Sequence, residues 1–200
     1  MENSTHLIAG RLCLDFANSG TFPATEPPET LSWEQLIGFL EASRIVTRDR
    51  GEEMLLLTQA HPQAAYTLLA QANRLRDALR LVFHAMSRGK RAPLEWIQPI
   101  NAVLRVTEGH DEITWGGTGW RIEFVAREEG LEWLLAAIAR SAAELLTQGG
   151  ASRLRECANP ACSLLFYDDS RTRKRRWCTM ALCGNRSKVA AFAKRRSAGA

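Results

Sequence analysis

Four cysteines near the C-terminal end of the chain are the residues whose type and spacing point most directly to chemistry. Cys157 and Cys162 form one C-x4-C pair, Cys178 and Cys183 form another, and the 15 residues 163–177 separate the pairs. Thiolates are good ligands for Zn²⁺, which prefers four ligands in a tetrahedron, and two short loops can each present two sulfur atoms. The spacing therefore predicts one metal site, with a small hairpin in the segment between the pairs.

Two disulfides, four unrelated thiols and an iron–sulfur centre are the alternatives to a zinc site. Residues 1–10 show neither the basic nor the apolar stretch of a secretion signal, and thiols that are not exported are kept reduced. Equally spaced pairs around a hairpin-sized spacer favour zinc over iron. Because four thiolates leave no open position for water, we expect one structural and not catalytic Zn²⁺.

The cysteines lie in the basic part of a chain whose two parts have opposite charge. Residues 151–200 contain 12 Lys and Arg against 3 Asp and Glu, which gives +9, and residues 1–150 contain the remaining 14 basic and 19 acidic residues, which gives −5. A clustered basic surface attracts a polyanion, since binding releases counterions from a phosphate backbone. Ten residues are therefore candidates for nucleic-acid contacts: Arg171, Arg173, Lys174, Arg175, Arg176, Arg186, Lys188, Lys194, Arg195 and Arg196.

A helix over residues 185–196 is expected to carry part of this basic surface. Its spacing would turn Val189, Phe192 and Ala193 toward the core of the cysteine module, residues 151–200. One or two basic residues, with Arg186 the first candidate, are expected instead to offset the negative charge of a zinc tetrathiolate. A module of about 50 residues buries little apolar surface, so we expect it to melt without metal.

Residues 1–150 are predicted to form a helix-rich α+β domain that precedes the module. A largely buried strand is expected from His6 to Phe16, where Cys13 would be an inert thiol, and a loop is expected from Thr21 to Pro28. Caps and apolar periodicity predict the other elements: helices from Ser32, with Gln35 as its capping partner, to Ser43, from Glu52 to Ala60, from Pro62 to Gly89, from Pro93 to Leu104 and from Leu131 to Leu146, and a hairpin of Ile113–Trp115 with Trp120–Val125.

The composition and the remaining motifs argue against several classes of protein. With 46% hydrophobic and 24% charged residues the chain is expected to fold, and no apolar run approaches the ~20 residues that cross a bilayer, so we expect a cytoplasmic protein. The four histidines show no metal-binding spacing, and no G-x-S-x-G or phosphate-loop motif occurs. We therefore expect no enzyme.

Two groups of side chains in the large domain are candidates for a ligand site. Asp15 and Asn18 flank the end of the predicted strand, where they either bind a ligand or form a simple turn, and we favour the turn. Trp33, Trp115 and Trp120 either line a pocket for a small-molecule effector or pack in the core.

The cysteine module resembles the CGNR zinc finger of bacterial proteins. The resemblance rests on Cys157 to Cys162, Leu165 to Asp168, Arg175 to Met180 and the tetrapeptide Cys183-Gly184-Asn185-Arg186, and it spans about residues 153–196. In that family the finger follows a domain called ABATE, whose opening resembles Leu12 to Asn18 here. The resemblance implies zinc ligands at the four cysteines, DNA as the partner and a stress-related role in transcription regulation.

We thus expect an ABATE-like sensing or regulatory domain at residues 1–150 and a DNA-binding zinc finger at residues 151–200. In the predicted mechanism, zinc fixes the hairpin and the terminal helix, which offer basic side chains to phosphates or base edges. A zinc-stabilised adaptor that docks an acidic protein and an RNA-binding protein are the alternatives.

Overall fold

The computed structural model describes residues 7–20, 30–106, 108–115, 117–127 and 131–190. It confirms a helix-rich fold with two small antiparallel sheets and four clustered cysteines at the C-terminal end. The large domain contains α1 (Leu12–Asn18), α2 (Trp33–Ala42), α3 (Arg48–Ala60), α4 (Pro62–Ser87), α5 (Leu94–Val106), β1 (Gly109–Trp115), β2 (Trp120–Ala126), the 3₁₀ turn η1 (Glu132–Leu135) and α6 (Ala136–Thr147). The module contains the 3₁₀ turn η2 (Gly150–Arg153), β3 (Leu154–Glu156), β4 (Leu165–Tyr167) and the π-helical turn η3 (Met180–Gly184).

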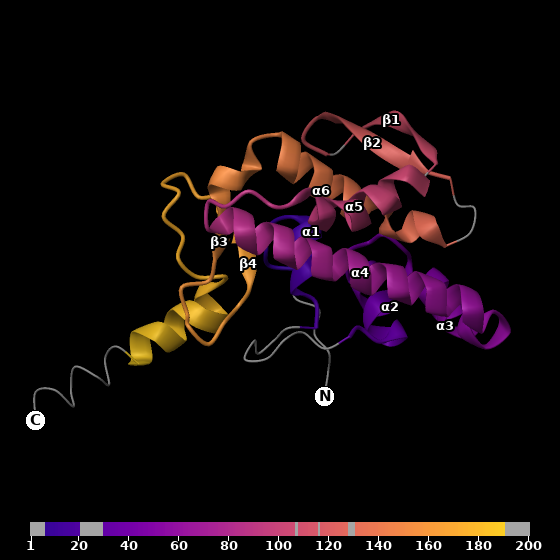
Figure 1. Ribbon diagram of the computed structural model, residues 1–200, viewed down its shortest axis with the longest axis horizontal. Coiled ribbons are helices and arrows are strands. Elements are labelled where there is room, and N and C mark those ends of the chain that lie inside the picture. The colour runs from indigo at the N-terminus through magenta and orange to yellow at the C-terminus, as the bar shows by residue number, and fades with distance from the viewer. Residues whose placement is uncertain (1–6, 21–29, 107, 116, 128–130, 191–200) are drawn as a thin grey trace, which may run out of the picture.

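Helix α1 lies at the centre of the large domain, between α4, α6 and β4 (Figure 1). The strand predicted from His6 to Phe16 is therefore wrong for its described part. Every residue of α1 from Cys13 to Asn18 is buried, so a run of apolar residues faces protein on all sides. Such a run carries no periodicity that separates a buried strand from a buried helix.

The caps predicted for the other helices are confirmed. The hydroxyl of Ser32 accepts from the Gln35 amide and the Gln35 side chain accepts from the Ser32 amide, which closes the capping box of α2. Pro62 opens α4, and Gly89, with φ of +69°, follows its end. Helix α3 begins four residues before the predicted Glu52, and the first predicted turn of the last helix is the 3₁₀ turn η1.

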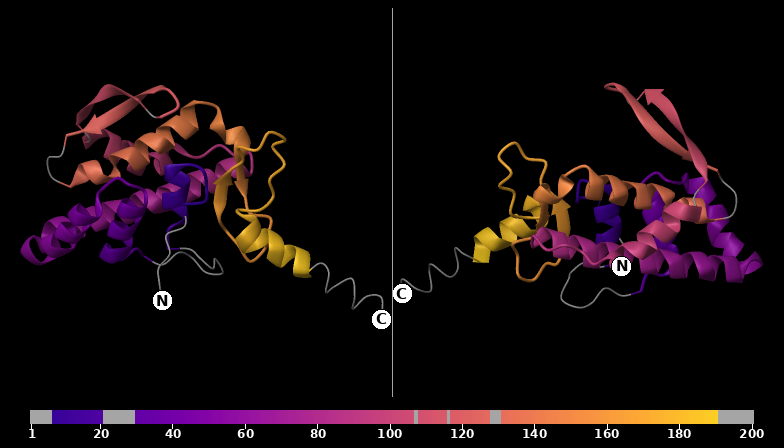
Figure 2. Two further views of the ribbon diagram at one scale, coloured as in Figure 1. Left: turned by 180° about the vertical axis from the view of Figure 1, so that it is seen from behind. Right: turned by 45° about the horizontal axis from the view of Figure 1, so that its top comes forward.

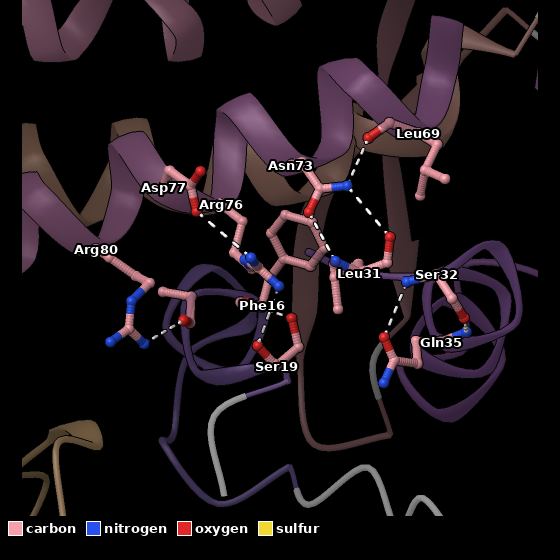
Figure 3. A network of polar contacts seen from close by, with 11 residues as sticks. Phe16, Ser19, Leu31, Ser32, Gln35, Leu69, Asn73, Arg76, Asp77 and Arg80 are labelled. Atoms are coloured by element: carbon pink, nitrogen blue, oxygen red, sulfur yellow. Dashed lines mark hydrogen bonds and ion pairs between the residues drawn. The ribbon is translucent and has the colours of Figure 1, made fainter. Parts of the chain in front are cut away.

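Polar side chains of the long helix α4 hold the shorter helices in place (Figure 3). The Asn73 side chain accepts from the Leu31 amide at 2.8 Å, next to the N-cap of α2, and donates to the Leu69 carbonyl at 3.0 Å. Arg80 donates to the Ala17 carbonyl at 3.1 Å, near the end of α1. Helix α4 thus fixes the positions of both α1 and α2.

One apolar core joins the large domain to the cysteine module. Leu154, Leu165 and Phe166 of β3 and β4 have no exposed surface and lie in the same cluster of buried side chains as α1, α4 and α6. The loop predicted from Thr21 to Pro28 lies outside the described residues. The predicted hairpin of the large domain is confirmed as β1 and β2, which pair from Gly109 with Ala126 to Trp115 with Trp120.

Candidate metal centre

The four cysteine sulfurs meet at one point between two loops. The ligand atoms of Cys157, Cys162, Cys178 and Cys183 all lie within 4.8 Å of one another, and the four residues are buried. A Zn–S distance of about 2.3 Å places the sulfurs of a tetrahedral site about 3.8 Å apart. The distance of 3.6 Å between the sulfurs of Cys178 and Cys183 is close to this value, so the four cysteines can hold one Zn²⁺ ion.

The first loop is the connection between β3 and β4, not part of a hairpin between the cysteine pairs. Strands β3 and β4 pair antiparallel, with Leu154 opposite Tyr167 and Glu156 opposite Leu165. The Cys157 amide then donates to the Leu164 carbonyl at 3.0 Å, which extends the ladder to the first ligand. The hairpin was predicted between the two cysteine pairs, and this position is wrong. Strand β3 precedes Cys157 and strand β4 follows Cys162, so the first cysteine pair lies in the loop of the hairpin.

The second loop is built around Thr179 and Gly184. The Thr179 hydroxyl accepts from the Leu182 amide at 3.0 Å. The backbone carbonyl of Thr179 accepts from the amides of Cys183 and Gly184. A Cβ atom at Gly184 would lie 2.5 Å from the Met180 sulfur and 3.1 Å from a ring carbon of Trp177. A side chain at Gly184 would therefore displace the flexible Met180 side chain and crowd Trp177, although the Gly184 backbone is not left-handed.

Hydrogen-bond donors surround the sulfur cluster. The Cys178 amide donates to the sulfur of Cys157 at 3.4 Å, and the Asn159 side chain donates to the sulfur of Cys183 at 3.4 Å. A hydrogen bond from the Cys178 thiol, against the effect of burial, lowers the pKa of Cys162 to about 5. By contrast, burial raises the pKa of Cys157, and the hydrogen bond with Cys162 raises the pKa of Cys178, so the low pKa favours the metal-binding thiolate at Cys162.

Arg175 joins the second cysteine loop to β4 and to the segment before α1, and it does not face solvent as its neighbours do. Its guanidinium donates to the carbonyls of Trp177, at 3.0 Å, Cys178, and Ile8, at 3.4 Å, and stacks 4.5 Å from the centre of the Phe166 ring. We therefore leave Arg175 out of the nucleic-acid contacts that the sequence predicted.

Asp168 fixes the segment between β4 and Arg175 from a fully buried position. Its carboxylate accepts from the amide of Ser170 at 3.1 Å, from the Ser170 hydroxyl at 2.5 Å and from the Arg175 amide at 3.0 Å. Burial acts to raise the pKa of Asp168, but these hydrogen bonds outweigh it and hold the pKa below its usual value. The Asp168 carboxylate thus links Ser170 to Arg175 and turns the chain toward the second loop.

Two polar contacts tie the hairpin of the module to the large domain. The Asn18 side chain donates to the Leu165 carbonyl at 2.8 Å and accepts from the Leu165 amide at 3.0 Å, as a neighbouring strand would. The Tyr167 amide donates to the Ala9 carbonyl at 2.8 Å. The β4 strand is therefore held from the side of α1.

A third contact joins β3 to the end of α4. Glu156 accepts from His84 at 2.9 Å, from the Ser87 hydroxyl at 2.8 Å and from Arg88 at 2.9 Å. Burial opposes ionisation of Glu156, but the hydrogen bonds from Arg88, His84 and Ser87 lower its pKa to about 2. The sequence reasoning missed Glu156, Asp168 and Asn159. Only their places beside the cysteines and the strand ends could have indicated them.

Six of the ten predicted contact residues are exposed around the metal centre. These are Arg171, Arg173, Lys174, Arg176, Arg186 and Lys188, and in the described part of the chain the structure gives none of them an ion pair. Lys194, Arg195 and Arg196 lie outside the described residues, as do Phe192 and Ala193. The predicted helix is present over 185–190, but Val189 is 68% exposed and does not face a core.

The remaining predicted residues lie away from the metal. Asp15 is buried, and its carboxylate accepts from the amides of Ile8, at 2.7 Å, and Ala9, at 2.8 Å, while burial raises its pKa. With Asn18 it lies in a helix, so both the strand end and the turn predicted for them are wrong. Their role in ligand binding stays a prediction, since the contacts described here join them to the protein's own backbone. Burial raises the pKa of Cys13 to about 12, as expected of an inert thiol.

The three tryptophans considered for a pocket lie in different environments. Trp33 is 8% exposed and belongs to the core, whereas Trp115 and Trp120 are 59% and 72% exposed on the β1–β2 hairpin. The expectation that Trp115 and Trp120 pack in the core is therefore wrong. Among the described helices, none has both the length and the hydropathy that a membrane span requires.

Comparison with protein families identifies both parts of the chain. Residues 10–149 match the ABATE family, described as "Putative stress-induced transcription regulator", and residues 153–196 match the CGNR zinc finger. No curated protein matches the chain. The match over residues 10–149 covers more than half of the sequence, and the match over 153–196 contains all four clustered cysteines. The chain therefore belongs to the ABATE family and carries a CGNR zinc finger at its C-terminal end.

Proposed function

We propose that this chain is a transcription regulator that binds DNA through the exposed basic side chains of its zinc finger. The observation that carries the proposal is the separation of roles around the metal centre. Arg175 holds the second cysteine loop, while Arg171, Lys174, Arg176 and Arg186 are exposed on the same small module. Exposed side chains that form no ion pair within the described structure are available to phosphates, although Arg176 also lies over the Trp177 ring.

Two basic surfaces contribute to the proposed interface. One is the segment 170–176 between β4 and the second cysteine loop, and the other is the helix that begins at Asn185 and points away from the large domain (Figures 1 and 2). A metal ion held by the four cysteines would join the ends of both segments, since Cys178 follows the first and Cys183 precedes the second. Zinc would thus hold the two surfaces in a fixed relation, while the acidic large domain stays away from the polyanion.

The proposal predicts a steep dependence of affinity on salt. If the six exposed basic residues each neutralise one phosphate, the logarithm of the binding constant falls with the logarithm of salt concentration with a slope of about −5. Fluorescence anisotropy of the zinc-loaded chain with duplex DNA, single-stranded RNA and an acidic protein, each at several salt concentrations, measures this slope and the preferred partner.

A matched pair of variants tests the location of the interface. Arg171→Gln/Lys174→Gln removes one arginine and one lysine from the finger, and Lys90→Gln/Arg91→Gln removes the same charges from exposed positions before α5. The finger variant is expected to bind DNA about tenfold or more weakly and to reduce the salt slope by about 2, whereas the control keeps both values near those of the wild type. Equal losses in both variants, tighter binding of RNA or of the acidic protein, or a salt-independent affinity would contradict the proposal.

A further inference from the structure

The β1–β2 ribbon is the part of the large domain with the fewest neighbours. It stands away from the helices when the molecule is turned (Figure 2), and in the described residues its strands pair only with each other. Six of the seven residues of β1 are exposed. Arg140 of α6 reaches Asp111 at 3.2 Å, which links the base of the ribbon to the body.

One face of this ribbon is apolar and exposed. Ile113 lies opposite Ile122, and Trp115 lies opposite Trp120, so the four side chains share a face. Their exposed fractions are 73%, 71%, 59% and 72%, respectively, and the two indole rings meet edge to face at 5.3 Å. Identical residues therefore face each other across the two strands.

The size of this surface marks it as an interaction site. Two tryptophans and two isoleucines, each exposed over more than half of its surface, offer an apolar patch on the order of 600 Å², at the upper end of the ~300–600 Å² that the largest patch of a monomer covers. A two-stranded hairpin is also marginally stable in water unless its apolar face packs against something. Both points indicate that another surface covers this face.

The charges of the ribbon decide which kind of surface this is. Asp111, Glu112 and Glu123 outnumber Arg121 in the two strands, so the ribbon repels a polyanion such as DNA. Asp111, which shares the apolar face, is already paired with Arg140. The face therefore presents apolar groups without an unpaired charge, while Glu112 lies at a register position of the opposite face, so two copies of the apolar face can meet without bringing these acidic groups together.

We propose that two copies of this chain dimerise by packing the Ile113, Trp115, Trp120 and Ile122 faces of their ribbons together. A two-fold axis through the contact places the same patch on both sides, as an isologous interface requires. Two sheets packed face to face lie about 10 Å apart, a spacing that large side chains such as isoleucine and tryptophan fill. The patch approaches the ~800 Å² per partner of a standard interface.

Sedimentation equilibrium of the zinc-loaded full chain without DNA tests this contact. We expect a wild-type mass of twice the 22.3 kDa of one chain. Ile113→Asp/Ile122→Asp places charges in the contact and is expected to weaken the dimer about 100-fold or more, with unchanged helix content and zinc stoichiometry. Trp120→Ala, which keeps the ribbon apolar, is expected to weaken it about tenfold.

Leu94→Asp is the matched control, because Leu94 is 70% exposed at the start of α5 and lies outside the ribbon. It is expected to remain a dimer. A wild-type chain that stays at 22.3 kDa up to about 100 µM overturns the proposal, as does a dimer that survives the double isoleucine variant. Because no DNA is present, the outcome is independent of the proposed function.

Discussion

At the scale of single residues, the basic run Arg171 to Trp177 shows how similar side chains take different roles. Arg175 and Arg176 are neighbours, yet Arg175 donates to three carbonyls from a partly buried position, whereas Arg176 is exposed and lies 5.1 Å from the Trp177 ring. One residue stabilises the finger, and the other is free to contact a partner.

The first prediction compares these two neighbours. Arg175→Ala is expected to lower the free energy of unfolding by about 2–4 kcal/mol, because it removes the donor to three partly buried hydrogen bonds and the stack on Phe166. Arg176→Ala should cost less than about 1 kcal/mol, since only an exposed ring contact is lost, but it should weaken DNA binding. Denaturant titration of both zinc-loaded variants measures the difference. Similar losses of stability would show that the contacts of Arg175 are unimportant.

The sequence predicted the metal ligands but not the different roles of Arg175 and Arg176. Cysteine spacing is local, and the preferred coordination of zinc restricts what two pairs of thiols can do. The structural role of Arg175 depends on its contacts with Ile8, which is distant in sequence, and with Phe166, which lies on β4. No feature of the run Arg-Lys-Arg-Arg distinguishes one arginine from the next.

At the scale of elements, the joints between the finger and the helices decide how firmly the metal centre is held. Helices α2, α4 and α5 could be predicted because their caps and periodicity are local. Helix α1 and the position of the β3–β4 hairpin could not, because α1 is buried on all sides and β3 lies outside the cysteine spacing. Both depend on tertiary packing.

The second prediction concerns the joint between β3 and α4. Glu156→Gln removes the charge that accepts from His84, Ser87 and Arg88, so we expect a loss of about 1–2 kcal/mol in unfolding free energy. Asp169→Asn, which removes the same charge from an exposed position in the finger, is the control and should change stability by less than about 0.5 kcal/mol. Thermal unfolding of the two proteins side by side tests the joint, and equal midpoints would argue against it.

At the scale of the whole molecule, the finger is not an independent module. Leu154, Leu165 and Phe166 belong to the core of the large domain, whereas the second cysteine loop is held by its ligands, by Arg175 and by the partly buried Trp177 and Leu182. The expectation that the module as a whole melts without metal therefore needs refinement. The hairpin adds fully buried side chains to the core, whereas the second loop adds, besides its two cysteines, the partly buried Trp177 and Leu182, so the second loop depends more on the metal.

The third prediction follows from this asymmetry. After removal of zinc by a chelator, amide hydrogen exchange should accelerate strongly over residues 174–190, while β3, β4 and α4 keep most of their protection. Exchange measured by mass spectrometry with and without the chelator gives the answer for each segment. Loss of protection throughout residues 154–190, or no loss in either part, would contradict the proposed division.

The central claim is that one tetrathiolate zinc ion organises the finger and thereby its basic surface. X-ray absorption at the zinc edge, on purified protein with a measured metal content, tests it most directly. We expect one zinc per chain and a single shell of four sulfurs at about 2.3 Å. A shell that contains nitrogen or oxygen ligands, or zinc well below one per chain, would contradict the account.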